Sequence, residues 1–400
     1  MNLFFIFALI MLSILYGIVG IRIIPTLQIS YHWKIVFWSV LTILALMPIT
    51  PIILRSKGIE NNTVDYFSWA GYISLGFIVL TFLAVVTKDF IYLAIGMITK
   101  LTASFGYSVE PADPDRRDFI QKMLSIGILT TTGLSTGVGL YNARKGARII
   151  KETAQIKNLG NNLNGLKIAQ ISDLHVGPTI KKGYVEEVVE QVNNLNPDII
   201  AITGDMVDGS VKYLKTHVEP LKDLNAKIGK YFVTGNHEYY SGVDQWLDET
   251  DRLGFTNLID DHNIISQKGD SFALGGVTDY RSSTIKPAHE TVAINASSKA
   301  PTNLPKILLA HQPMSIFNAH KAKVDLQLSG HTHGGQFWPF VYAVRLANPY
   351  TAGLHNHDGT LIYVNRGTGY WGPPMRIGVD SEITLITLQS KKNEFIHENS

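Results

Sequence analysis

The 400-residue sequence contains no cysteine, which excludes disulfide bonds, thiolate metal sites and thiol nucleophiles. That absence leaves the redox compartment open. Charge is sparse as well, since Asp, Glu, Lys and Arg make up 17% of the chain and the formal net charge is +2. So small an excess gives no general attraction to nucleic acid, and the sequence has no stripe of basic and aromatic residues that would bind it. We therefore expect no nucleic-acid partner.

The N-terminal part of the chain is dominated by apolar residues. Four runs approach the roughly 20 residues that cross a hydrocarbon core: 3–24, 35–54, 67–86 and the more polar 120–141. A shorter run, 90–98, either prolongs the third helix or lies at the membrane interface. Buried helices of a soluble domain are the alternative, but three long runs with few or no internal charges argue against it. The sequence predicts a multi-pass region of about four helices over 1–144, in the cell membrane.

The distribution of charge does not decide on which side of the membrane the C-terminal part of the chain lies. Basic residues flank the fourth run on both sides, with Arg116, Arg117 and Lys122 before it and Arg144, Lys145, Arg148 and Lys151 after it. Paired arginines before an apolar run resemble a twin-arginine export signal, which would put the C-terminal part outside the cytoplasm. Two basic residues that anchor a helix end explain the pattern equally well. The export interpretation tilts the expectation toward the extracytoplasmic face.

From residue 145 onward the composition is that of a soluble protein. Residues 145–164 are basic and then rich in Asn and Gly, which predicts a juxtamembrane linker, and 391–400 are expected to form a tail. Between them, residues 165–390 alternate β-rich runs with helical periodicity. Strands are expected at 166–172, 198–203, 230–234, 272–274, 306–310, 325–328, 361–364 and 382–388, and helices at 183–194 and 211–224. This alternation predicts an α/β core with parallel strands.

Histidines, carboxylates and an amide gather where predicted strands end. They are Asp173 and His175, Asp205 and Asp208, Asn236 with His237 and Glu238, then His311, and finally His331 with His333. Loops at the carboxyl ends of parallel strands converge on one crevice, so these side chains are expected to meet there. Their oxygen and nitrogen donors suit Mn, Fe or Zn.

The set exceeds what one ion can bind, so two divalent metal ions that share a carboxylate are expected. Two ions about 3.5–4 Å apart form the usual clamp for phosphoryl chemistry, because they lower the pKa of a bridging water and neutralise phosphate charge.

These motifs, read in order, resemble the signature of the calcineurin-like metallophosphoesterase superfamily. They are Asp173-Leu-His175, Gly204-Asp205-Met-Val-Asp208, Gly235-Asn236-His237-Glu238, His311 and Gly330-His331-Thr-His333, and the resemblance covers about residues 166–388. It implies a four-layer α/β/β/α sandwich, here preceded by an all-α transmembrane region. The apolar N-terminus, Gly334-Gly335-Gln336 and a later Arg366-Gly367-x-Gly369 with Pro374 and Arg376 are similar to the YkuE/YaeI-like membrane phosphodiesterases.

The resemblance also implies a role for each site residue. Asp173, His175 and His333 would bind the first metal ion, Asp205 would bridge both ions, and Asn236, His311 and His331 would complete the second site. His237 would donate a proton or a hydrogen bond to the phosphate or leaving group, with Asp208 orienting it. Glu238 would support the loop. His355 and His357 lie in a late segment that reads as an exposed turn, and they have no assigned role.

The expected activity is hydrolysis of a phosphoester or pyrophosphate by a metal-bridging hydroxide, with a phosphodiester on a lipid-linked or interfacial molecule as substrate. Hydrolysis of UDP-2,3-diacylglucosamine, the activity of one related group, is an alternative within enzymes. A membrane sensor whose domain binds metal but is weakly catalytic is the alternative outside them. The sequence leaves open the natural substrate, the metal identity, the exact number of spans and the oligomeric state.

Overall fold

The computed structural model describes residues 3–107, 113–289 and 300–391. The chain divides into two compact units. The first comprises Met1–Leu140 with Gly372–Met375, and the second comprises Tyr141–Trp371 with Arg376–Ser400.

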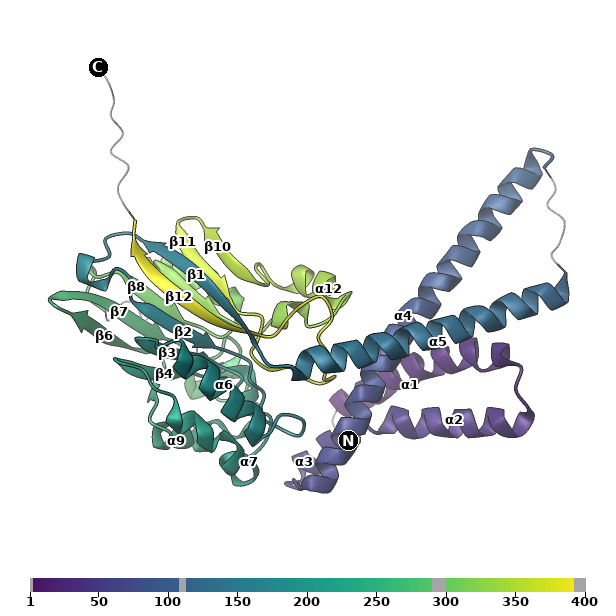
Figure 1. Cartoon of the computed structure of the whole chain (residues 1–400), viewed down its shortest axis with the longest axis horizontal. Coiled ribbons are helices and arrows are strands. Elements are labelled where there is room, and N and C mark those ends of the chain that lie inside the picture. The colour runs from purple at the N-terminus through teal and green to yellow at the C-terminus, as the bar shows by residue number, and fades with distance from the viewer. Residues whose placement is uncertain (1–2, 108–112, 290–299, 392–400) are drawn as a thin grey trace, which may run out of the picture. The chain divides into compact units, whose positions relative to one another are not determined.

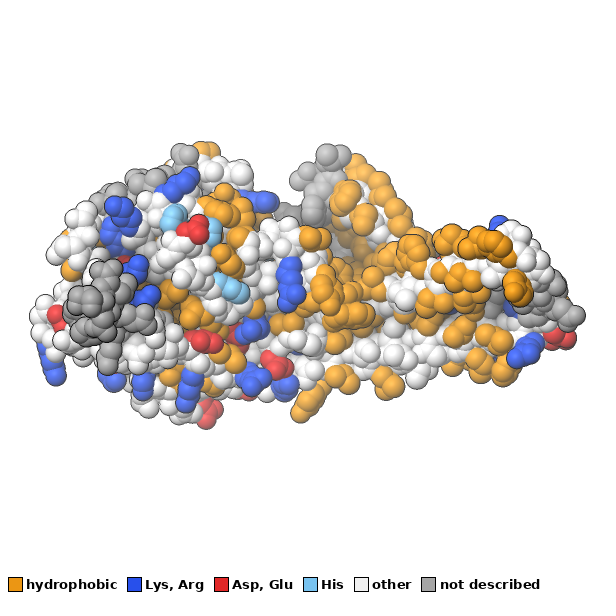
Figure 2. Space-filling model, turned by 90° about the horizontal axis from the view of Figure 1, so that it is seen from above, with side chains coloured by type: hydrophobic (Ala, Val, Ile, Leu, Met, Phe, Trp, Pro, Cys, Tyr) orange, Lys and Arg blue, Asp and Glu red, His pale blue; other side chains and the backbone are white. Residues whose placement is uncertain are grey.

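The first unit is helical (Figure 1), with α1 (Leu3–Ile23), α2 (Tyr31–Leu46), α3 (Thr50–Ser56), α4 (Asn62–Ser104) and most of α5 (Pro114–Arg144). Four helical segments are long and apolar enough to cross a membrane: Ile6–Leu27, Tyr31–Ser56, Asn62–Ser104 and Pro114–Arg144. Hydrophobic side chains lie along these helices on the face drawn in Figure 2. The four predicted apolar runs thus lie in helices that are long and apolar enough to span a membrane, in agreement with a multi-pass region.

The structure places two segments of that region whose roles the sequence left open. Residues 90–98 continue α4 without a break, so the interpretation that they prolong the third helix is confirmed. The Arg116-Arg117 pair lies in the first turn of α5, a position that both interpretations of the pair allow.

The second unit is built on two six-stranded sheets. The first has the order β1 (Arg148–Ile156), β12 (Glu382–Ser390), β2 (Lys167–Ile171), β3 (Ile199–Thr203), β4 (Gly229–Val233), β5 (Thr256–Asn257). The second has the order β10 (Gly353–His357), β11 (Thr360–Val364), β9 (Leu326–Ser329), β8 (Lys306–Leu309), β7 (Asp270–Gly276), β6 (Asp261–Gln267). Strands β2 to β4 are mutually parallel, and so are β7 to β9 with β11.

Alternating side chains of each central strand serve two different cores, as the period of two in a strand requires. In β3, Ile199 and Ala201 pack between the sheets, whereas Ile200 and Ile202 face α6 (Lys182–Asn194), α7 (Val211–Val218) and α9 (Val243–Arg252). The outer face of the second sheet is covered by α11 (Ile316–Lys321). The order of layers is helix, sheet, sheet, helix, which confirms the predicted four-layer sandwich.

The predicted linker over 145–164 is wrong for nearly half of its length. Residues Arg148–Ile156 form β1, which pairs in parallel with β12 through nine residue pairs at the edge of the first sheet. Its alternation of apolar with charged or polar residues fits an edge strand that buries only part of its surface, such as Ala154 and Ile156. The expected exposed turn at His355 and His357 is wrong too, because both residues lie in β10, paired with β11.

Candidate metal centre

Every site residue that the sequence predicts lies just beyond the carboxyl end of a parallel strand. Asp173 and His175 follow β2, Asp205 and Asp208 follow β3, Asn236 and His237 open α8 (Asn236–Ser241) after β4, His311 follows β8, and His331 and His333 follow β9. The two sheets therefore contribute loops to the same edge of the sandwich, and the side chains meet there.

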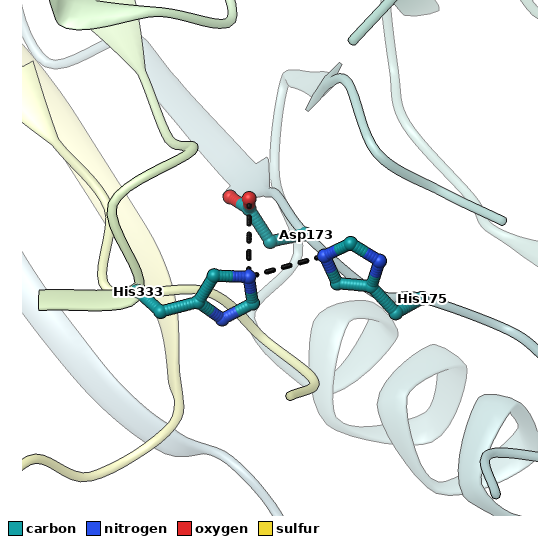
Figure 3. Close-up of side chains that lie close together, drawn as sticks. All are labelled: Asp173, His175 and His333. Atoms are coloured by element: carbon teal, nitrogen blue, oxygen red, sulfur yellow. Dashed lines mark hydrogen bonds and ion pairs between the residues drawn. The ribbon is translucent and has the colours of Figure 1, made fainter. Parts of the chain in front are cut away.

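The first group consists of Asp173, His175 and His333 (Figure 3), whose ligand atoms lie within 4.8 Å of one another. The Nε2 atoms of His175 and His333 are 3.0 Å apart, and Asp173 Oδ1 is 3.5 Å from His333 Nε2. All three residues are buried. Two imidazole nitrogens and a carboxylate that converge on one point match the donors of a divalent transition-metal ion.

The second group consists of Asp205, His311 and His331. Asp205 Oδ2 lies 3.1 Å from His311 Nε2, and His331 Nδ1 lies 3.2 Å from the same nitrogen. Asp205 Oδ2 is also 3.9 Å from His175 Nε2, which belongs to the first group. The Asp205 carboxylate thus stands between the two groups.

Neighbouring acceptors fix which ring nitrogen each histidine can offer. His175 Nδ1 lies 3.1 Å from Asp208 Oδ2, and His311 Nδ1 lies 2.8 Å from the carbonyl oxygen of Thr203. Donation of Nδ1–H to these oxygens leaves both Nε2 lone pairs free for a cation.

A fully buried arginine contacts His333, the second histidine of the first group. Arg376 donates from Nη1 to the carbonyl oxygen of His333 at 3.0 Å and brings Nη2 within 3.2 Å of His333 Nδ1. Burial, reinforced by His175 and Arg376, lowers the pKa of His333 well below its usual range, so the ring stays uncharged. An uncharged imidazole is the form that binds metal ions.

The buried oxygen of Asn236 tests whether the residues fit a metal ion. Asn236 Oδ1 is enclosed and has no hydrogen-bond partner among the described residues. A buried acceptor without a partner costs free energy unless something else occupies its lone pairs, and a cation does so. Together with the oxygen and nitrogen donors of both groups, this unpaired oxygen fits the binding of divalent metal ions.

Asp208 and His237 form a pair beside the two groups. His237 Nδ1 is 2.5 Å from Asp208 Oδ1, and the other oxygen of the same carboxylate reaches His175. Burial lowers the pKa of His237, but the carboxylates of Asp208 and Asp205 outweigh burial and raise the pKa to about 10. At neutral pH His237 is therefore protonated and can donate a hydrogen from Nε2, which lies 4.0 Å from Asp205 Oδ2.

The backbone of the site is strained at its ligand positions. Asp173, His175, Asp205, His331 and His333 all have φ between 50° and 70°, the left-handed region that L-residues other than Gly rarely adopt. Close approach also dictates two glycines. A Cβ at Gly330 would lie 1.9 Å from Ser172 Oγ, and one at Gly235 would lie 2.2 Å from Asp205 Oδ1, so neither position has room for a side chain.

Glu238 holds the loop that carries Asp205, as the sequence comparison implied. Its fully buried carboxylate accepts hydrogen bonds from the backbone N–H groups of Asp205 at 3.0 Å, Met206 at 2.7 Å and Gly235 at 2.7 Å. Three donors from two strand-end loops therefore share one side chain.

Replacing Glu238 by alanine is expected to lower the free energy of unfolding by about 3 kcal/mol, because three buried N–H groups lose their acceptor. Thermal unfolding of the full chain in detergent measures the change. Glu190→Ala on the exposed face of α6 is the matched control, with an expected change within about 0.5 kcal/mol. Equal midpoints for the two variants would contradict this role for Glu238.

Sequence reasoning missed the contributions of two residues. Arg376 stood out only within a terminal motif, and nothing in the sequence indicated that it reaches His333. Trp371 was not singled out, yet its ring lies 5.6 Å from that of His237, while Gln336 binds the Trp371 backbone through two hydrogen bonds of 2.9 Å. Gln336, three residues after His333, was the available signal.

Comparison with known proteins agrees with this geometry. The calcineurin-like phosphoesterase family model matches residues 166–335. The zebrafish (Danio rerio) transmembrane protein with metallophosphoesterase domain is 36% identical over 65% of this chain and 62% of its own length, and its cattle (Bos taurus) counterpart is 37% identical over 71% and 66%. This chain thus spans less than two thirds of either. The Bacillus subtilis metallophosphoesterase YkuE is 31% identical over 69% of this chain and 98% of its own length. The chain belongs to the calcineurin-like metallophosphoesterase family.

Proposed function

We propose that this protein is a dinuclear-metal phosphodiesterase that hydrolyses a phosphodiester or pyrophosphate of a membrane lipid. The buried Asp205 carboxylate between two His/Asp groups carries the proposal. One divalent ion would be bound by Asp173, His175 and His333. The other ion would be bound by Asn236, His311 and His331, and Asp205 would bind both. When bound, such ions neutralise phosphate charge and lower the pKa of a water molecule for attack on phosphorus.

The residues of this chain would supply orientation and a proton. His237, charged and held at Nδ1 by Asp208, would donate from Nε2 to the leaving oxygen of the substrate. A protein that only binds metal and ligand needs no such donor, and this favours the enzyme over a sensor.

Two exposed aromatic rings flank the proton donor. Tyr240 and Trp371 lie 5.3 Å and 5.6 Å from the His237 ring and are 67% and 54% exposed. Flat apolar rings beside a polar centre favour a substrate with apolar or aromatic groups next to its phosphate. A phosphodiester or pyrophosphate that carries a group on each side fits this arrangement better than a small inorganic phosphate ester.

Metal removal tests the activity. Full-length protein in detergent is expected to hydrolyse bis-p-nitrophenyl phosphate with added Mn²⁺, to lose more than about 99% of that rate after EDTA treatment, and to regain it when Mn²⁺ returns. Reconstitution with Fe²⁺ or Zn²⁺ identifies the preferred ion. Protein that binds two ions by elemental analysis yet turns over no diester would favour the sensor instead. A panel of phospholipids and UDP-2,3-diacylglucosamine then defines the substrate.

A further inference from the structure

Helix α12 (Phe340–Ala347) has no buried side chain. Tyr342 and Leu346, one turn apart on the helix, and Trp338, which precedes the helix, are 58%, 92% and 57% exposed, and we call these three residues the α12 apolar face. A single eight-residue helix gains little stability in water from its own hydrogen bonds. Large apolar side chains left exposed next to a candidate active site indicate a partner surface.

The start of α12 is fastened to the metal-binding loop. A Cβ on Gly335, two residues after His333, would come within 2.4 Å of Val341 Cα, so the first turn of the helix rests on that glycine. Trp338 N donates to the carbonyl oxygen of Ile377 at 3.0 Å. The start of α12 therefore lies next to the loop that carries His333.

The same short segment also holds the last turn of α5. Asn142 Nδ2 donates to the carbonyl oxygen of Arg376, the residue before Ile377, at 3.3 Å. The neighbouring Ala143 is fully buried in the core shared with α6 and the first sheet. Neighbouring residues of one segment thus bind the start of α12 and the end of a helix long and apolar enough to cross a membrane.

The apolar run of α5 ends at Tyr141, and Arg144, Lys145 and Arg148 follow. An aromatic residue followed by basic residues is typical of the level of the lipid headgroups. The α12 apolar face has the same character, since it combines Trp and Tyr with Leu, and the exposed Arg345 is adjacent to Leu346 in the chain. The lipid bilayer is therefore the partner that charge and position both favour.

We propose that the α12 apolar face inserts into the headgroup boundary of the membrane that α5 enters, and that it holds the metal centre at the level of lipid phosphates. The lipid substrate in this proposal rests on the proposed function, because it requires that the protein cleaves a phosphoester. Insertion itself does not depend on that function. A second copy of this chain is the competing occupant of the face.

A single spin label measures insertion directly, because the chain has no cysteine of its own. Leu346→Cys carries a nitroxide in full-length protein reconstituted into nanodiscs of phosphatidylcholine and phosphatidylglycerol. The label is expected to be more accessible to oxygen than to a water-soluble nickel complex, at a depth of about 5–10 Å. Glu190→Cys on α6 is the control and should report water. Equal nickel accessibility at both positions, or spin–spin coupling between two labelled copies at position 346, would overturn the proposal.

Turnover separates insertion from chemistry. In nanodiscs, Leu346→Glu is expected to reduce hydrolysis of a phospholipid in the disc by about tenfold, equivalent to about 1.4 kcal/mol, and to leave bis-p-nitrophenyl phosphate hydrolysis unchanged. Leu346→Met should restore the wild-type rates. An equal effect on both substrates, or none on either, would contradict a role of α12 at the bilayer. If no variant hydrolyses any phosphoester, the proposed function fails, while the depth of the label still decides insertion.

Discussion

Replacing Asp205 by asparagine is expected to reduce phosphodiester hydrolysis by at least about a thousandfold, the largest effect of any single change in this chain. Asp205 stands between the two His/Asp groups, and one of its oxygens lies within 3.9 Å of a histidine from each. Asparagine keeps the shape of the side chain but removes the negative charge that two cations would share. Both ions should therefore bind more weakly, and the remaining protein should lack the means to neutralise the phosphate.

The measurement combines rate with metal content. Elemental analysis of the purified variant is expected to give clearly fewer than two ions per chain. Asp358→Asn is a close control because Asp358 is exposed and has φ of 49°, against 52° at Asp205, so the same substitution is made on the same backbone conformation. Full turnover by metal-depleted Asp205→Asn protein would rule out the metal-dependent assignment.

Replacing His237 by alanine is expected to lower kcat by about a hundred- to ten-thousandfold and to leave two metal ions in place. His237 forms a third group of possible ligand atoms with His175 and Asp208, but its Nδ1 atom is held by Asp208, and we propose that it binds no metal ion. Its loss removes a proton donor whose pKa the neighbouring carboxylates raise to about 10. The two substitutions thus differ in metal content while both reduce the rate.

Leaving-group dependence gives a second readout for His237. Without a proton donor, esters with poor leaving groups should lose more rate than p-nitrophenyl esters, whose oxygen leaves readily without protonation. His355→Ala, on the exposed strand β10, should retain the full rate with both kinds of ester. Equal losses with both would assign His237 to positioning and not to proton transfer.

The sequence predicted most of the fold because its central strands are short apolar runs bounded by polar motifs. The position of the site could be predicted as well, because each motif comes directly after a parallel strand and the carboxyl ends of parallel strands converge. The third transmembrane run was anticipated only in part, because Thr87, Lys88 and Asp89 interrupt apolar residues that α4 nevertheless continues through.

Other features depend on contacts between residues distant in sequence. Strand β1 reads as a polar connector because its pairing with β12 joins residues more than 230 positions apart. Arg376 is buried against His333 through a turn whose path no local pattern encodes. His355 and His357 read as a turn because β10 is an edge strand whose alternation of Leu, His, Asn and His shows no clear apolar face.

The five left-handed residues at the metal centre limit how this protein can be made to withstand heat. Each such conformation costs on the order of 1 kcal/mol, and together they approach the roughly 5 kcal/mol that many domains have as their whole margin against unfolding. Substitutions that relieve this strain would raise thermal stability, yet Asp173, Asp205 and the three histidines carry the donor atoms that we propose for the metal ions. Any added robustness must therefore come from the sheets and helices that surround them.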